Sequence, residues 1–351
     1  MNVLIDYHHG ELYESLLKLF EDRLAFNVYR PIGKEWFDEG YWKISDDKGV
    51  VEQYLKFFDF HIEVENGIYI DNWPRGFKKN IENERKHKCI TLNAAKEIKW
   101  DIIVSTINEQ FFPMENFIKK YCPSTKHILQ VGNMCYPVHP DAKNVLNSTT
   151  SICNAPNYIE YNQEFDLTPF VYKKPSNIKS ISSFLHFNSR HKGYRFFEME
   201  SEMKDWTFKE YGVGNRDGCS KTYHGQCEQY LNTGFVWHVK LIGDGYGYNL
   251  YKTLASGRPL VLNYSHFYKN NHKLFNRNYF DIERTIIDYQ KYFSPTDLNF
   301  DNKSNSDLKY ELEKKLENWD DNSLYIYNKF RELVNFDEEF TKIKIFIEKL
   351  I

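Results

Sequence analysis

The stretch of the sequence best suited to chemistry is rich in glycine and reads GDGYGYNLYKTLASGRPLV, from Gly243 to Val261. Its pattern predicts a turn, a helix from Tyr248 to Ala255, and a helix stop at Gly257 before a further strand. Gly245 and Gly247 would let backbone N–H groups approach a ligand closely, and the helix would direct its positive N-terminus to the same place. Phosphate is the ligand that such a site favours, although glycine-rich turns also occur without any ligand.

Two adjacent histidines, His8 and His9, follow the end of a predicted strand and stand between Asp6 and Glu11. Histidine can take a proton from a hydroxyl group near neutral pH, and a carboxylate can orient it. We therefore expect His8 or His9, backed by Asp6 or Glu11, to act as a catalytic base. The alternative is that one histidine caps the helix that begins at Glu11 and the other is solvated. This turn lacks the GxGxxG pattern of nicotinamide-binding folds.

Polar or glycine positions also follow two later predicted strands, DIIVS and HILQV. Asn108 and Glu109 come after the first strand, and Gly132 and Asn133 come after the second. Open α/β sheets bind ligands at the carboxyl ends of their strands, so these four positions are expected to line a cleft.

These residues depend on strands and helices that alternate along the chain. A strand over 2–6, apolar residues at helical spacing over 12–20 and a strand over 26–29 predict a βαβ unit. The pattern recurs with a strand over 101–105, a helix over 114–121 and a strand over 127–131. Such alternation indicates a parallel sheet with helices on both faces. A second series of strands and helices is predicted over 180–187, 193–203, 206–211, 234–241, 248–255 and 260–263, followed by helices over the last fifty residues.

A chain of 351 residues exceeds what one hydrophobic core usually supports, which favours two domains. The proline-containing segment DLTPFVYKKPSN, residues 166–177, is predicted to be the linker. The predicted division is an N-terminal lobe over 1–170, a C-terminal lobe over 178–320, and helices over 321–351 that pack back toward the first lobe. Residues 31–100 are interpreted as an irregular, aromatic-rich insertion.

The charge and composition exclude several classes of protein. The formal net charge is −3, so no overall field attracts nucleic acid or anionic lipid. No stretch is long and apolar enough for a membrane span or a secretory signal, which predicts a cytoplasmic protein. The six cysteines form no CxxC pair, as is typical of reduced thiols. No D-x-D, HExxH or Walker A motif is present, so neither a metal nor a cofactor is expected.

The glycine-rich stretch resembles the donor-lobe segment of GT-B glycosyltransferases, E-G-F-G-x-x-x-x-E-A-x-A-x-G-x-P. DGYGYNLYKTLASGRP matches it without a gap, and FLHFNSRHKGYRFF is similar to the first strand and loop of that lobe. In the family, an Arg and a Lys-Gly pair in this loop hold the diphosphate, whose developing negative charge must be stabilised as it leaves. The resemblance implies that the residues that bind the donor are Arg190, Lys192, Asp244, Gly245, Tyr246, Gly247, Tyr248 and Lys252.

One residue departs from the family pattern. The second acidic position, which in the family usually binds the ribose hydroxyls, is Lys252 here, and lysine only donates hydrogen bonds. The resemblance therefore implies either that Lys252 meets a donor phosphate or that the ribose is bound elsewhere. It leaves open whether the anomeric configuration is retained or inverted.

The resemblance implies a hexosyltransferase-like, metal-independent enzyme with two Rossmann-like α/β lobes facing across a cleft and C-terminal helices. The resemblance implies that the C-terminal lobe, 178–320, binds the donor, a nucleotide sugar with a UDP-sugar as one candidate. It implies that the N-terminal lobe, 1–170, binds the acceptor, a hydroxyl group of a glycan or small molecule. Three alternatives remain: a nucleotide-sugar epimerase, a non-catalytic sugar- or nucleotide-binding protein of the same fold, and a viral-type glycosyltransferase that acts on DNA bases.

Overall fold

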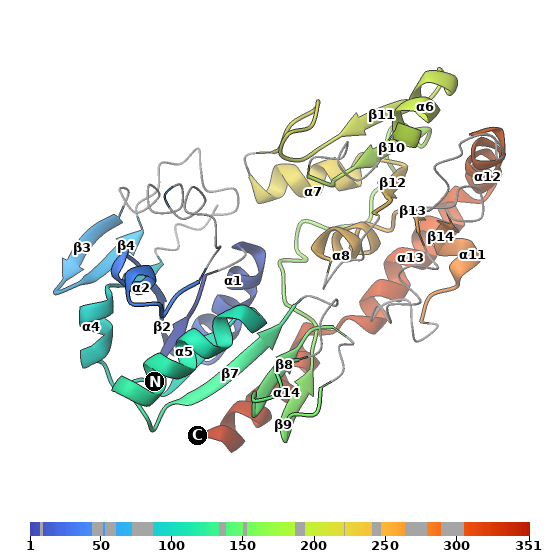
Figure 1. The fold of residues 1–351 in the computed structure, drawn as a ribbon. Helices are drawn as coiled ribbons and strands as arrows, with labels where there is room; N and C mark the ends of the chain where they lie inside the picture. Colours follow the sequence, from blue (N-terminus) through green and yellow to red (C-terminus); the bar gives the residue numbers. More distant parts are fainter. Residues whose placement is uncertain are drawn as a thin grey trace. The chain divides into compact units, whose positions relative to one another are not determined.

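The structure is a computed structural model that describes residues 1–7, 10–43, 52, 61–71, 87–132, 138–149, 153–186, 194–220, 222–240, 247–263, 279–288 and 305–351. These residues form two compact units (Figure 1). Of the described residues, those up to 165 and those over 336–351 form the first unit, which contains both termini, and those over 166–335 form the second. Among the described helices, none is both long and apolar enough to cross a membrane.

The first unit is built on a nine-stranded sheet in the order β3-β4-β5-β2-β1-β6-β7-β8-β9. In the described sheet, β4 runs in the direction opposite to that of the other strands. The order in which strands are added to the sheet reverses at β1, because β2 pairs with one edge of β1 and β6 pairs with the other. The strands are β1 (Asn2–Ile5), β2 (Asn27–Pro31), β3 (His61–Glu65), β4 (Ile68–Asp71), β5 (Lys88–Ile90), β6 (Ile102–Ser105), β7 (Lys126–Val131), β8 (Asn144–Asn147) and β9 (Asn157–Glu160).

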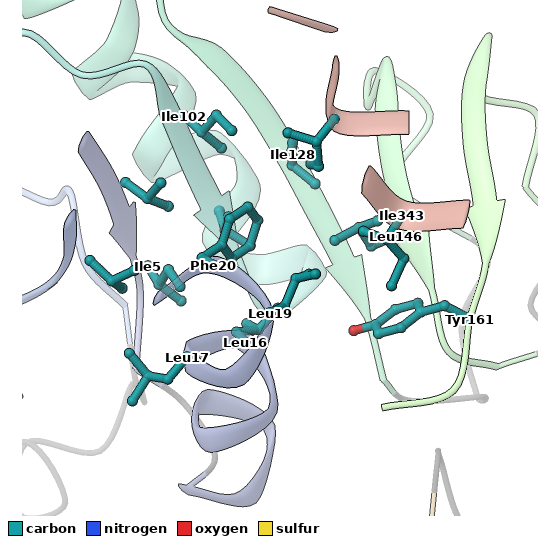
Figure 2. Packing of buried hydrophobic residues seen from close by; sticks show 14 of the residues in the cluster. Ile5, Leu16, Leu17, Leu19, Phe20, Ile102, Ile128, Leu146, Tyr161 and Ile343 are labelled. Carbon is teal, nitrogen blue, oxygen red and sulfur yellow. The ribbon is translucent and has the colours of Figure 1, made fainter. Parts of the chain in front are cut away.

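Helices cover both faces of this sheet, because alternate strand residues point to opposite sides. Val3 and Ile5 of β1 pack in one core cluster with α1 (Gly10–Leu17), η1 (Lys18–Arg23, a π-helix) and α14 (Phe336–Leu350). Figure 2 shows Ile343 of α14 beside Leu146 of β8 in this cluster. Leu4 packs on the opposite face, with α2 (Glu35–Asp38), α4 (Leu92–Glu97) and α5 (Asn108–Tyr121).

The prediction of an irregular insertion over residues 31–100 is wrong for the described part of that range. It contributes three strands of the sheet, and Trp36 and Trp100 are fully buried. Their indole N–H groups donate to the carbonyl oxygens of Ile90 and Ala95, at 3.0 and 2.8 Å. The strands escaped prediction because β5 has three residues and most of β3 is exposed, which leaves no buried alternation to read.

The second unit contains a five-stranded parallel sheet in the order β11-β10-β12-β13-β14. Its strands are β10 (Ser180–Ser183), β11 (Thr207–Glu210), β12 (Phe235–His238), β13 (Leu260–Leu262) and β14 (Ile286–Asp288). Its helices are α6 (Tyr194–Glu202), α7 (Tyr223–Leu231), α8 (Tyr248–Ala255), α11 (Ile282–Thr285), α12 (Asn305–Glu317) and α13 (Trp319–Leu333). Here too the order reverses beside the first strand, between β10 and β12.

Helix α8 has the bounds predicted for it from the sequence. It packs against α13 and α7. The predicted helix stop is also confirmed, because Gly257 has a φ of +71° and its N–H donates to the carbonyl oxygen of Leu254 at 2.9 Å. A side chain at Gly257 would lie 2.6 Å from the carbonyl oxygen of Ser323 in α13, so both the backbone angle and the close approach require glycine.

The chain crosses between the units after Phe165 and returns after Asn335. Within the first unit, one arginine joins both crossings. Arg23 of η1 donates from Nε and Nη2 to the two oxygens of Glu164, at 2.7 and 3.0 Å, and from Nη1 to Asp337 at 2.8 Å. The ends of the two crossings on this side are therefore held by a single guanidinium group.

We expect Ile343→Ala to lower the free energy of unfolding by about 2–4 kcal/mol, because it opens a cavity where α14 meets the sheet. Ile345 lies on the same helix but is 49% exposed, against 3% for Ile343. Ile345→Ala should therefore cost at most about 0.5 kcal/mol. Urea denaturation of both variants makes the comparison, and equal losses would contradict the packing of α14 described above.

Candidate functional site

In both units, candidate residues lie where the strand order reverses at the carboxyl edge of the sheet. Asp6 directly follows β1 and Thr106 directly follows β6, the two strands on either side of the reversal in the first unit. In the second unit, Phe184 follows β10, and α8 connects β12 to β13. Ligands of open α/β sheets bind at such points, which makes each of these two edges a candidate site within its own unit.

The carboxyl group of Asp6 is buried, and among the described residues Thr106 alone donates hydrogen bonds to it. The backbone N–H of Thr106 donates to both oxygens of Asp6, at 3.1 and 3.0 Å, and the Thr106 hydroxyl donates to Oδ1. Burial raises the pKa of Asp6 from 3.8 to about 7, although the hydrogen bonds from Thr106 oppose the shift. Asp6 can therefore gain or lose a proton near neutral pH.

The predicted partners of Asp6, His8 and His9, lie outside the described residues, as does Asn133. Asn108 is the first residue of α5, and its side-chain oxygen accepts from the N–H of His139 at 3.2 Å.

Glu109 is exposed in the first turn of α5, and Gly132 follows β7. A side chain at Gly132 would lie 3.3 Å from the amide nitrogen of Gln163. Asp6, the start of α5 and Gly132 are thus all found at the carboxyl ends of neighbouring strands.

The second edge is formed by the beginning of α8. Gly247 precedes the helix with φ 71° and ψ 61°, a left-handed conformation that favours glycine. As glycine has no side chain, the residue at the N-cap position provides no side-chain acceptor for the first N–H groups of the helix. A helix start of this kind, with its positive dipole end, is suited to an anionic ligand.

Asn249 joins the first turn of α8 to the end of β10. Its amide nitrogen donates to the carbonyl oxygen of Phe184 at 3.0 Å, and its oxygen accepts from the hydroxyl of Tyr230 in α7 at 2.8 Å. The ring of Phe184 stacks on Tyr230, with centroids 3.7 Å apart, and on Tyr211, with centroids 5.4 Å apart. The start of α8 is thereby fixed against two other elements.

Lys252 faces the interior of the second unit. It is 1% exposed, its ammonium group donates to Oε1 of Gln226 at 2.9 Å, and it lies 5.3 Å from the centre of the Tyr223 ring. These contacts hold the lysine against α7.

The remaining predicted donor residues lie outside the described part of the chain, namely Arg190, Lys192, Asp244, Gly245 and Tyr246. Tyr248 is buried as the first residue of α8. In the part of the chain that the structure describes, no group of three or more His, Cys, Asp or Glu side chains could hold a metal ion.

A hydrogen-bonded chain of Ser105, His127 and Glu115 has the residue types of a catalytic triad. The Ser105 hydroxyl lies 2.9 Å from His127 Nε2, and His127 Nδ1 lies 2.8 Å from Glu115 Oε2. Ser105 is fully buried, however, and Phe111 stacks on the imidazole with centroids 4.5 Å apart. No substrate can reach this serine, so the chain of contacts serves to join β6, β7 and α5.

Two residues of these edges, Thr106 and Asn249, were missed by the sequence analysis. Thr106 could have been found, because it is the residue directly after the predicted strand DIIVS. Asn249 stands inside the segment matched to the glycine-rich motif, at a position that the motif leaves unspecified, and its partners Phe184 and Tyr230 are far away in the sequence. No local signal identifies such a residue.

Comparison with solved structures identifies the architecture. HepE from Anabaena, solved with UDP-glucose, superposes with a TM-score of 0.60 at 10% identity, and covers 99% of this chain and 100% of HepE. Sucrose-phosphate synthase from Thermosynechococcus elongatus gives a TM-score of 0.60 at 9% identity, over 100% and 99% of the two chains. An alpha-glucosyltransferase, solved with UDP and a 13-mer DNA, gives 0.59 at 11% identity, over 99% and 100%. No protein family matches the sequence, and no curated protein does so.

These neighbours are GT-B glycosyltransferases, and identities near 10% show a shared fold alone. The chain has that fold: two Rossmann-like α/β units with C-terminal helices. The fold class expected from the sequence is confirmed. The site residues stay predictions.

We expect Asp6→Asn to remove a pH-dependent loss of stability. The pKa of Asp6 is about 7 in the folded protein and about 3.8 when exposed, so between these values the folded state retains a proton that the unfolded state has lost. Stability should fall as pH rises through this window, by up to about 4 kcal/mol at roughly 1.36 kcal/mol per pKa unit. Asparagine, which carries no charge, should cancel that component.

Urea denaturation at pH 4.5 and pH 7.5 measures the effect as the difference between the wild type and Asp6→Asn. The other titrating groups are common to both proteins and cancel in this difference. A difference that stays constant across the two pH values would show that the Asp6 pKa is not raised.

Proposed function

We propose that this protein is a glycosyltransferase that moves a sugar from a nucleoside-diphosphate sugar to an acceptor hydroxyl. The observation that carries the proposal is the likeness to UDP- and UDP-glucose-bound glycosyltransferases over 99% of the chain. In the proposed reaction, the bond between the sugar and the diphosphate breaks and a bond to the acceptor oxygen forms. The proton of the acceptor passes to a base, and the nucleoside diphosphate leaves.

On the donor side, the diphosphate would bind at the start of α8. Support comes from the left-handed Gly247, which itself provides no side-chain cap, and from the position of the helix beside the reversal of strand order. Arg190 and Lys192 would add positive charge to the leaving diphosphate. The buried Lys252, already bonded to Gln226, would act by holding α7 against α8.

On the acceptor side, Asp6 is the proposed acid–base centre. A pKa near 7 suits a group that must accept a proton from His8 or His9, or from the acceptor itself, at neutral pH. Thr106 fixes the carboxyl group by donating to both of its oxygens. Asn108, Glu109, Gly132 and Asn133 would contact the acceptor from the adjoining strand ends.

A DNA base is a second candidate acceptor, because one of the solved neighbours was bound to UDP and to DNA. The net charge of −3 weighs against strong electrostatic binding of a polyanion. Binding to duplex DNA that weakens steeply with salt, and transfer of sugar to that DNA, would favour this candidate over a glycan or small molecule.

A panel of nucleotide sugars, screened by thermal shift, should give stabilisation by one donor. At a hundredfold excess over its dissociation constant, a ligand stabilises the folded state by about 2.7 kcal/mol. Arg190→Ala should abolish the shift, because the arginine is proposed to hold the diphosphate. Arg216→Ala, which alters a half-exposed arginine paired with Glu200 in the same unit, is the control and should keep it. An unchanged shift in Arg190→Ala would remove Arg190 from the donor site.

Transfer should also survive the removal of divalent cations. The proposed site neutralises the leaving diphosphate with the α8 N-terminus and basic side chains, which need no metal. We expect the rate of sugar release or transfer from the donor identified in the screen to stay within about twofold in excess EDTA, a difference worth less than 0.5 kcal/mol. A loss that magnesium or manganese restores would contradict this mechanism.

A further inference from the structure

Asn249 lies in the first turn of the helix proposed to bind the diphosphate, yet both of its side-chain partners belong to other elements. Its amide nitrogen reaches the carbonyl oxygen of Phe184, one residue beyond β10. Its amide oxygen reaches the hydroxyl of Tyr230 in α7. The side chain thus connects the start of α8 to Phe184, the residue directly after β10, and to the helix α7.

The orientation of this amide is determined by its partners. A carbonyl oxygen only accepts hydrogen bonds, so the group of Asn249 that faces Phe184 must be the NH₂ group. The amide oxygen is then directed to Tyr230, whose hydroxyl donates to it. Exchanging the oxygen and nitrogen would place two acceptors together at Phe184, which excludes the flipped arrangement.

The Phe184 carbonyl is itself held in place, because the Phe184 ring stacks almost parallel on Tyr230, at an interplanar angle of 13°. A second anchor acts within α8, where the Thr253 hydroxyl donates to the carbonyl oxygen of Asn249 at 2.6 Å. Asn249 therefore has little freedom to move relative to either β10 or the body of the helix.

We infer that Asn249 is a positioning residue for the donor: it fixes the first N–H groups of α8 relative to the carboxyl end of β10. This inference rests on the proposed function, because the donor is what these N–H groups would bind. Backbone N–H groups bind an anion well only when they are held in place beforehand, since hydrogen bonds at a loosened helix end lose both geometry and dipole alignment. Asn249 supplies this rigidity, which Gly247, the residue before the helix, cannot supply because it has no side chain.

The test compares ligand affinity with stability in three variants. Asn249→Ala removes both contacts, Asn249→Asp removes the donated hydrogen bond and adds a negative charge, and Tyr230→Phe removes the Tyr230 hydrogen bond alone. The probes are UDP, GDP and ADP, with dissociation constants measured by calorimetry at 10 °C and unfolding temperatures measured without ligand. We expect at least a tenfold weaker affinity in Asn249→Ala, about 1.4 kcal/mol, a larger loss in Asn249→Asp and a smaller one in Tyr230→Phe.

Ser256→Ala is the matched control, because the Ser256 hydroxyl donates to the carbonyl oxygen of Lys252 at 2.7 Å at the opposite end of α8. It should lower the unfolding temperature to a similar extent and leave the dissociation constant unchanged. If Asn249→Ala and Asn249→Asp bind the nucleotide as tightly as the folded wild type, the inference is wrong and the proposed function stands. If the wild type binds none of the three nucleotides, the donor site and the inference both fail.

Discussion

Parallel pairing of β1 with β6, and of β10 with β12, is the constraint on which the candidate site depends. A parallel pair needs a crossover connection, and in a doubly wound sheet the connections leave the first strand on opposite faces. The loops at its carboxyl end therefore separate and leave room beside it. Asp6 and Thr106 lie at that place in the first unit, and Phe184 and the helix α8 at the equivalent place in the second. The two units thus place candidate residues at equivalent positions, at the carboxyl end of the first strand of each sheet.

The helix α8 is restrained at both ends, by different kinds of interaction. Asn249 holds its first turn with neutral hydrogen bonds. At its other end, Arg331 of α13 donates to the carbonyl oxygen of Ala255 at 3.0 Å, and also to that of Phe170. The cation lies where the helix dipole is negative, which favours the contact. Because Phe170 follows the crossing from the first unit, the last turn of α8 is joined directly to the segment through which the chain enters the second unit.

The sequence predicted the elements whose signal is local and failed where the signal depends on distant partners. The helix over 248–255 was predicted correctly because a glycine-rich turn precedes it and Gly257 ends it. Helix α5 begins at Asn108, earlier than the predicted start at Met114, and contains Pro113, which misleads a reading based on helix breakers. Strands β8, β9 and β14 and helix α7 were missed, since three or four residues carry no clear period and α7 has a weakly amphipathic sequence.

The same limit applies to the candidate site. Asp6 could be proposed from its position at a strand end, whereas its raised pKa depends on the burial that the assembled sheet imposes. Lys252 could be recognised as a departure from the family pattern, but its interaction with Gln226 could not, because α7 itself had no local signal. A candidate residue that is marked by its own segment can be predicted from the sequence. A pKa shift or a contact that depends on distant segments can be found only in the folded structure.

Asp6 and Arg258 are two buried ionisable groups that differ in how many hydrogen bonds the described residues give them. Arg258 is fully buried, and burial lowers its pKa to about 10. Its guanidinium donates to three carbonyl oxygens and a hydroxyl, those of Tyr230, Leu231, Lys173 and Ser323. Most of its hydrogen-bonding capacity is used, so the charge remains and ties four segments together.

Asp6 receives hydrogen bonds from one residue, Thr106, among those described, although a carboxylate can accept about four. Burial disfavours its ionised form, and the hydrogen bonds from Thr106 offset this only in part, so the pKa rises to about 7. A carboxyl group that was needed for stability alone would gain from further donors. With respect to the described residues, Asp6 thus keeps acceptor capacity beyond its bonds from Thr106, and a pKa near 7 allows it to exchange a proton at neutral pH.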